Sequence, residues 1–162
     1  MEKSPTYQVY VGSAGWEHPE WNGHFYPDGL PPEWRLAYYN TVFHCVYLPY
    51  PAWSRHDLQT LSGWVEDTQE RFRFVLEASP AGLADEDRSR LEVLAPRIGL
   101  EVDGPGLFDE RVVWLERSPD LKKLADKLQG LAASPCPVYL ISPDHNLEAM
   151  NQALTLLEVM GA

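Results

Sequence analysis

The sequence has few cysteines, few basic residues and no long apolar run. Its two cysteines, Cys45 and Cys136, form no CxxC pair or other metal-ligand spacing, so neither a metal site nor a disulfide framework is predicted. No apolar stretch approaches the roughly 18 residues of a membrane span, and no signal-peptide pattern is present. We therefore expect a soluble, cytoplasmic protein that needs no metal or other cofactor and has no membrane partner.

Basic residues are outnumbered by acidic ones, 13 to 24, which gives a net charge of −11. A field of this sign repels phosphate backbones, so nucleic acid is excluded as an expected partner. With 162 residues and 44% hydrophobic content, the chain is long enough for one compact domain with a sizeable core.

Short apolar segments alternate with segments of helical period, the pattern of βα units around a parallel sheet. Helices are predicted near residues 33–40, 54–65, 85–95, 120–131 and from about residue 147 onward. Strands are predicted at residues 7–12, 42–48, 72–78, 98–102, 112–116 and 138–141. The pattern predicts an α/β fold with about six mostly parallel strands.

Both ends of the chain carry distinctive motifs. Near the start, Val11-Gly-Ser-Ala-Gly-Trp16 is followed by Trp21, Gly23 and Phe25-Tyr-Pro27, and near the end stands Pro137-Val-Tyr-Leu-Ile-Ser-Pro-Asp-His145. These motifs resemble the first and last strand regions of the YecE-like proteins, a family of (β/α) barrels of the TIM type with no settled biochemical activity. The resemblance implies a single YecE-like domain spanning residues 1–162.

The chain is short for that fold, because a complete barrel takes about 250 residues and at least about 200. We interpret it as a shortened, incomplete TIM-like barrel whose middle units are missing or shortened near residues 80–111. An open sheet leaves edge strands with unpaired backbone groups. A homodimer or another protein partner is therefore expected to cover the edge. The alternative is a small closed barrel, or an edge covered by the loop of residues 99–110.

Polar positions of the family's barrel interior are altered in this chain. By the resemblance, a glutamate and an asparagine of the second strand correspond to Phe43 and Cys45, and a lysine of the third strand corresponds to Glu77. An arginine and a histidine of the fifth strand correspond to Trp114 and Glu116. The leading hypothesis is a non-catalytic interaction or scaffold domain with a degenerated pocket.

An enzyme is the alternative from a different class. Glu77 and Glu116 are predicted to end two strands, and paired carboxylates there would serve as general acid and base in a small hydrolase or isomerase. The competing interpretation of Glu77 is a salt bridge with Arg73 on the same strand face.

A third hypothesis is a small-ligand-binding protein. Trp16, Trp21 and Tyr47 would line the pocket, and Ser13 lies in the glycine-rich loop beside it. The competing interpretation of the aromatic residues is a packed lid over one end of the barrel.

Histidines offer a further set of candidate bases or metal ligands: His18, His44, His56 and His145. No two of them have the i, i+4 spacing of a helical metal pair, so each taken alone is better explained as a structural side chain. The sequence predicts no metal site.

Overall fold

The computed structural model describes residues 9–102, 111–131 and 136–161. In these residues the strands form one sheet with the order β4-β3-β2-β1-β6-β5, and every pair of neighbours is parallel. The strands are β1 (Val9–Ala14), β2 (Cys45–Leu48), β3 (Arg73–Glu77), β4 (Ile98–Val102), β5 (Val112–Trp114) and β6 (Val138–Ser142). The predicted α/β fold is confirmed, with all six described strands parallel.

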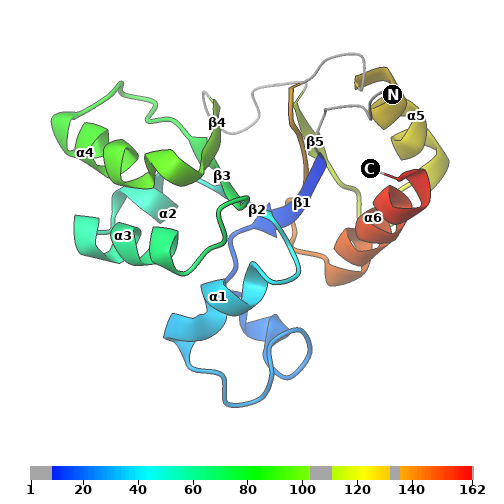
Figure 1. The fold of residues 1–162 in the computed structure, drawn as a ribbon, viewed down its shortest axis with the longest axis horizontal. Coiled ribbons are helices and arrows are strands. Elements are labelled where there is room, and N and C mark those ends of the chain that lie inside the picture. The colour runs from blue at the N-terminus through cyan, green and yellow to red at the C-terminus, as the bar shows by residue number, and fades with distance from the viewer. Residues whose placement is uncertain (1–8, 103–110, 132–135, 162) are drawn as a thin grey trace.

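Helices cover the convex face of the sheet, with α3 and α4 beside β3 and β4, and α5 and α6 beside β5 and β6 (Figure 1). The α-helices are α1 (Arg35–Tyr39), α2 (Tyr50–Ser54), α3 (Leu58–Glu66), α4 (Asp85–Leu94), α5 (Leu121–Leu131) and α6 (Leu147–Met160). Short 3-10 turns are η1 (Pro19–Trp21), η2 (Pro32–Trp34) and η3 (Ala95–Arg97). In the part of the chain described, no helix is long and apolar enough to cross a membrane.

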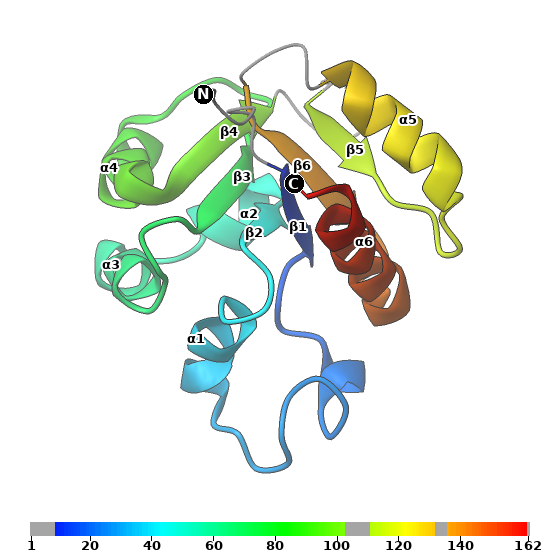
Figure 2. The ribbon, with the colours of Figure 1, turned by 45° about the vertical axis from the view of Figure 1, so that its right-hand side comes forward.

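The sheet is strongly curled (Figure 2). The rings of Tyr47 on β2 and Trp114 on β5 meet at 5.2 Å between centroids, although β1 and β6 lie between these strands in the sheet. On the same concave face, the hydroxyl of Tyr139 on β6 approaches Gly99 on β4 so closely that a Cβ there would lie 2.3 Å from it. The result is a half-barrel, which confirms the prediction of an incomplete TIM-like barrel.

Side chains that alternate along the strands divide the core in two, as expected for parallel strands in a barrel. One cluster lies between the sheet and the helices and contains Val11, Val46, Phe74 and Leu140. The other fills the concave interior. Its members are Tyr10, Cys45, Tyr47, Val75, Val102, Val112, Tyr139 and Ile141.

The second strand begins later than predicted. The backbone N–H of Phe43 donates to the carbonyl of Tyr39, so the chain is still turning after α1, and β2 starts only at Cys45. Cys45 faces the interior as predicted. The predicted interior position of Phe43 is wrong: because it precedes the strand, it packs in the outer cluster against Phe25 and Tyr39.

Two other predicted boundaries also change. The helix predicted over residues 54–65 begins later, at Leu58, because the Asp57 side chain accepts from the backbone N–H of Thr60 and caps α3 there. β5 ends at Trp114, so Glu116 lies beyond the strand. The range near 80–111, where barrel units were predicted to be missing, holds α4, η3 and β4, and residues 103–110 lie outside the described residues.

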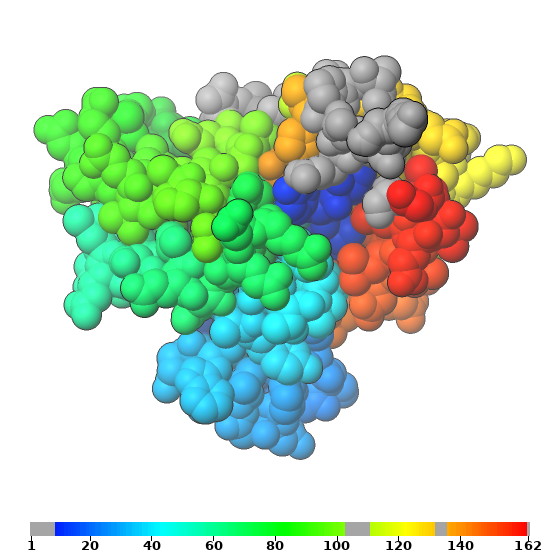
Figure 3. Space-filling model, in the orientation of Figure 1, coloured from blue at the N-terminus to red at the C-terminus, as the bar shows by residue number. Residues whose placement is uncertain are grey.

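Residues 15–44, between β1 and β2, form a lobe that projects from one end of the half-barrel (Figures 1 and 3). Its core is aromatic: the Trp21 ring contacts those of Phe25, Tyr26 and Tyr39. The Tyr39 hydroxyl fixes the lobe to the sheet, since it accepts from the Ser13 N–H at 3.0 Å and donates to the Cys45 carbonyl at 2.7 Å.

Candidate functional site

Glu77, predicted as a catalytic carboxylate, is buried at the carboxyl end of β3, with 6% of its surface exposed. Its two carboxylate oxygens accept hydrogen bonds from the Tyr47 hydroxyl at 2.9 Å and from the Tyr50 backbone N–H at 3.1 Å. Burial raises the pKa of Tyr47, and the neighbouring Glu77 carboxylate adds to this rise. The carboxylate is thus held by hydrogen bonds to the protein, which is the usual condition for a buried charge.

The predicted salt bridge between Arg73 and Glu77 is wrong, since no ion pair joins them among the described residues. The Arg73 guanidinium donates instead to the backbone carbonyls of Glu70 and Phe72. Both side chains have therefore taken other partners.

Glu77 and Glu116 are not brought together. Glu77 lines a cavity of about 270 Å³ between β3 and α4, whereas the exposed Glu116 lines a groove of about 230 Å³ between β5 and α5. The carboxylate that shares the cavity of Glu77 is Glu101 on β4, which sequence reasoning did not single out.

The predicted ligand residues are also distributed. Trp16 lines a cavity of about 140 Å³ beside Trp64, and Trp21 is 1% exposed within the lobe. Tyr47 lies in the barrel interior. This placement favours the alternative interpretation, in which the aromatic residues form a packed lid.

Ser13 has a structural role. It is fully buried, and its hydroxyl donates to the carbonyl of Gly15 at 2.5 Å. With its backbone N–H bound by Tyr39, the residue links β1 to the lobe.

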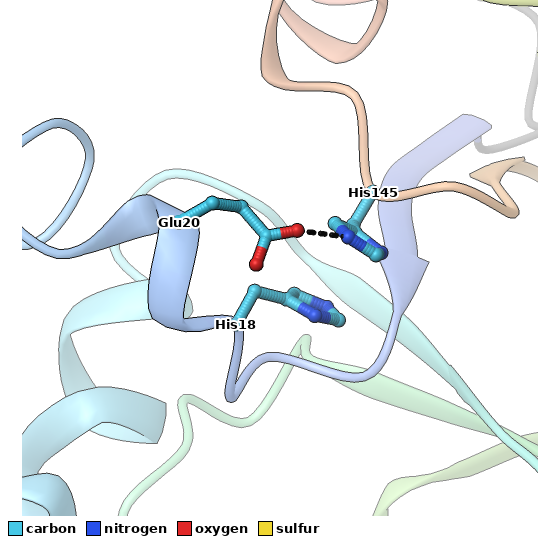
Figure 4. A group of neighbouring side chains, drawn as sticks. All are labelled: His18, Glu20 and His145. Carbon is cyan, nitrogen blue, oxygen red and sulfur yellow. Dashed lines mark hydrogen bonds and ion pairs between the residues drawn. The ribbon is translucent and has the colours of Figure 1, made fainter.

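A cluster of three side chains lies where the loops after β1 and β6 meet (Figure 4). His18 follows β1, Glu20 belongs to η1, and His145 precedes α6. The imidazole rings of His18 and His145 stack with 3.8 Å between centroids and 11° between planes, and Nε2 of His145 pairs with a carboxylate oxygen of Glu20. One nitrogen or oxygen from each of the three residues lies within 4.8 Å of the others.

The surrounding backbone fixes His145. Its φ of 46° places it in the left-handed region, which is uncommon for a residue other than glycine. The Trp21 indole donates to its carbonyl at 3.2 Å, and the next residue, Asn146, caps α6 by accepting from the Ala149 N–H. The cap of α6 is therefore Asn146, and the His145 side chain is left to the cluster.

The electrostatics favour a neutral imidazole beside an ionised carboxylate. Burial lowers the pKa of His18, and the nearby His145 lowers it further. The pKa of Glu20 is lowered by a hydrogen bond from its own backbone N–H and by the contact with His145. These are the protonation states in which such side chains bind metal ions.

The sequence offered His18 and His145 only as separate candidates and did not point to Glu20, because position 145 lies far along the chain from positions 18 and 20. The signal that could have found it was topological. In a barrel of parallel strands the first and last strands are neighbours, so polar residues just after each of them meet at one end.

Comparisons with known proteins agree with this geometry. The family model described as "Protein of unknown function DUF72" matches residues 10–94, just over half of the chain. No curated protein matches the chain.

Two crystal structures are similar in fold. A DUF72 family protein from Thermotoga maritima is 14% identical with a TM-score of 0.62, over 96% of this chain and 100% of that one. A DUF72 family protein from Enterococcus faecalis is 10% identical with a TM-score of 0.61, over 98% of this chain and 100% of that one. As the YecE-like resemblance predicted, this chain belongs to the DUF72 family.

Proposed function

We propose that this protein is a non-catalytic interaction domain whose partner is a second copy of the same chain. The observation that carries the proposal is the order of the sheet, in which β4 and β5 stand at the two edges and each pairs with one neighbour among the described residues. Pairing β4 of one copy with β5 of the other would continue the parallel sheet across both molecules.

The barrel interior supports a non-catalytic role. Tyrosines and apolar residues fill the concave face, and Glu77 is engaged by Tyr47 and Tyr50. The enzyme alternative needs Glu77 and Glu116 in one open cavity, whereas they line separate ones. A ligand would have to displace well-packed side chains to enter the concave interior.

Backbone groups at both edges point outward. The Val102 carbonyl accepts from the N–H of Ala78, just after β3, and since successive residues of a strand point to opposite sides, the N–H of Glu101 points away from β3. The Leu115 N–H donates to Ile141 on β6, so the backbone of Trp114 points away from β6. These are the donors and acceptors that a further strand pairs with.

Charged groups stand at both edges. The groove along β5 is lined by Trp114, which is 40% exposed, by the exposed Lys123 and Lys127 of α5, and by the acidic Glu116 and Asp120. The opposite edge presents the exposed carboxylate of Glu101. In the proposed pairing a second copy of the chain would place its Glu101 near one of these lysines.

The proposal includes the shortening of the barrel. Loss of two βα units between β4 and β5 would leave these two strands at the edges of the open sheet.

The buried Cys45 thiol, which forms no disulfide, fits a reducing compartment such as the cytoplasm.

The test is the solution mass by light scattering over a dilution series. We expect a dimer of twice 18.4 kDa for the unmodified protein. Glu101→Pro removes the outward N–H and should yield a monomer, while Glu101→Ala, the matched control, keeps that N–H and should remain largely dimeric. Far-UV circular dichroism confirms that both variants are folded. A monomer at every concentration of the unmodified protein, or equal dimerisation of the folded Glu101→Pro variant, would contradict the proposal.

A further inference from the structure

We propose that His18, Glu20 and His145 form a binding site for one divalent transition-metal ion, with zinc as the ion that best suits the donor set. The inference is independent of the dimer proposal, because it rests on the loops after β1 and β6 and not on the sheet edges.

The donor set is the first argument. Two imidazoles and one carboxylate are a recurrent set of three protein ligands for Zn²⁺ and for other first-row divalent ions. Here one donor atom from each residue lies within 4.8 Å of the other two, so only small side-chain movements are needed to bring all three onto one ion. The net charge of −11 also favours the approach of a cation.

The hydrogen bond of His18 is the second argument. Its Nε2 lies 2.9 Å from the Ala14 carbonyl. A carbonyl oxygen only accepts, so Nε2 carries the hydrogen and Nδ1 keeps its lone pair. A metal-binding histidine is commonly oriented in this way, with one ring nitrogen donating to a backbone carbonyl while the other binds the ion.

The pair formed by His145 and Glu20 is the third argument. Nε2 of His145 and a carboxylate oxygen of Glu20 already lie side by side in a hydrogen bond. A divalent ion would replace this hydrogen bond and bind both atoms, with the hydrogen on Nε2 passing to Nδ1 or to solvent. Protons and the ion compete for the same ligand atoms, so the affinity falls as the pH is lowered.

The site has room for further ligands. Glu20 and His145 line an open cavity of about 390 Å³ whose other charged or titratable groups are His24, Arg117 and Asp144. Arg117 and Asp144 form an ion pair at 3.1 Å, which leaves the acidic Glu20 as the charge beside the imidazoles. Three protein ligands beside an open cavity leave a coordination position for water.

The experiment is titration of the chelator-treated protein with Zn²⁺ by isothermal calorimetry at neutral pH. We expect one ion per chain. His18→Gln and His145→Asn, the latter chosen because asparagine tolerates the left-handed backbone, should each weaken binding at least about tenfold. The matched control is His44→Gln, because His44 lies against Arg71, away from the cluster. Its affinity should equal that of the unmodified protein.

A second readout uses Co²⁺, whose visible absorption reports coordination by nitrogen and oxygen ligands. Bands that appear with the unmodified protein and with His44→Gln, and that disappear with His18→Gln, would support the site. Equal Zn²⁺ affinity in all folded variants, or no binding to the unmodified protein below about 1 mM, would overturn the proposal.

Discussion

The concave interior of the half-barrel and the loop cluster at its end differ in packing and in polarity. In the interior, Tyr10 stacks on Tyr139 at 5.2 Å, and burial raises the pKa of Tyr139 and of the Cys45 thiol. In the cluster, His18 and His145 are only partly exposed and Glu20 is exposed beside an open cavity. The interior excludes water, whereas the cluster is open to it.

This difference shows which part of the molecule leaves polar side chains accessible to a ligand. Active sites of complete barrels lie at the carboxyl ends of the strands, on the loops that follow them. Here Tyr47 is hydrogen-bonded to Glu77, whose cavity lies toward α4, while the loops after β1 and β6 keep polar groups that face a more open cavity.

The largest effect is expected at Gly12 on β1. A Cβ there would lie 1.9 Å from the backbone carbonyl oxygen of Cys45, so Gly12→Ala forces two strands apart. We expect a loss of about 3 kcal/mol or more in the free energy of unfolding, or an insoluble product. Urea denaturation measures this change in the free energy of unfolding.

Gly63 provides the control for that substitution. It lies within α3 and has nothing within 4 Å of its Cβ position, so Gly63→Ala should stabilise the protein by about 0.5–1 kcal/mol. If Gly12→Ala were as stable as Gly63→Ala, the close packing of β1 against β2 would be refuted.

The second-largest effect is expected for the stabilisation of the protein by Zn²⁺ bound to the cluster of His18, Glu20 and His145. An ion that binds the folded state alone stabilises it by about 2.7 kcal/mol at a free concentration 100 times its Kd. Thermal unfolding should therefore shift upward with Zn²⁺ in the unmodified protein and in His44→Gln, and should not shift in His18→Gln. Equal shifts in all three proteins would mean that the ion binds elsewhere.

A smaller effect is expected for the interior. Tyr47→Phe removes a hydrogen bond to the buried Glu77 and leaves the carboxylate with the Tyr50 N–H, so we expect a loss of about 1–3 kcal/mol. In a Glu77→Gln background, where no charge needs compensation, the same substitution should cost less. An equal cost in both backgrounds would show that the two side chains are not coupled.

The smallest effect is that of pH. Burial lowers the pKa values of His18, His44 and His56 in the folded state, so the unfolded chain binds protons more readily. Their contribution to stability is complete above the unfolded pKa of about 6.5 and is lost as the pH falls below it. The urea concentration at half-unfolding should decrease as the pH is lowered from about 7.5 to about 5.5, and the decrease should be smaller in His18→Gln. An unchanged dependence in the variant would contradict the assignment to His18.

Much of the fold could be predicted from the sequence because local patterns encode it. Apolar segments predicted the six strands that the described residues form, and the motifs at both ends indicated the family. The predicted boundaries of strands and helices were less accurate where hydrogen bonds in the folded chain overrode the local apolar pattern. The turn that continues after α1 moved Phe43 out of the barrel, and the Asp57 cap moved the start of one predicted helix to Leu58.

The candidate sites depended on geometry that no local pattern carries. The composition and periodicity alone determined an acidic α/β protein of parallel strands, since burial and backbone pairing act on every residue in sequence order. Only the tertiary structure separated Glu77 from Glu116 and brought His18 and Glu20 against His145. The physical reason is that the curl of the sheet sets distances between strand ends, and those distances depend on the packing of the whole chain.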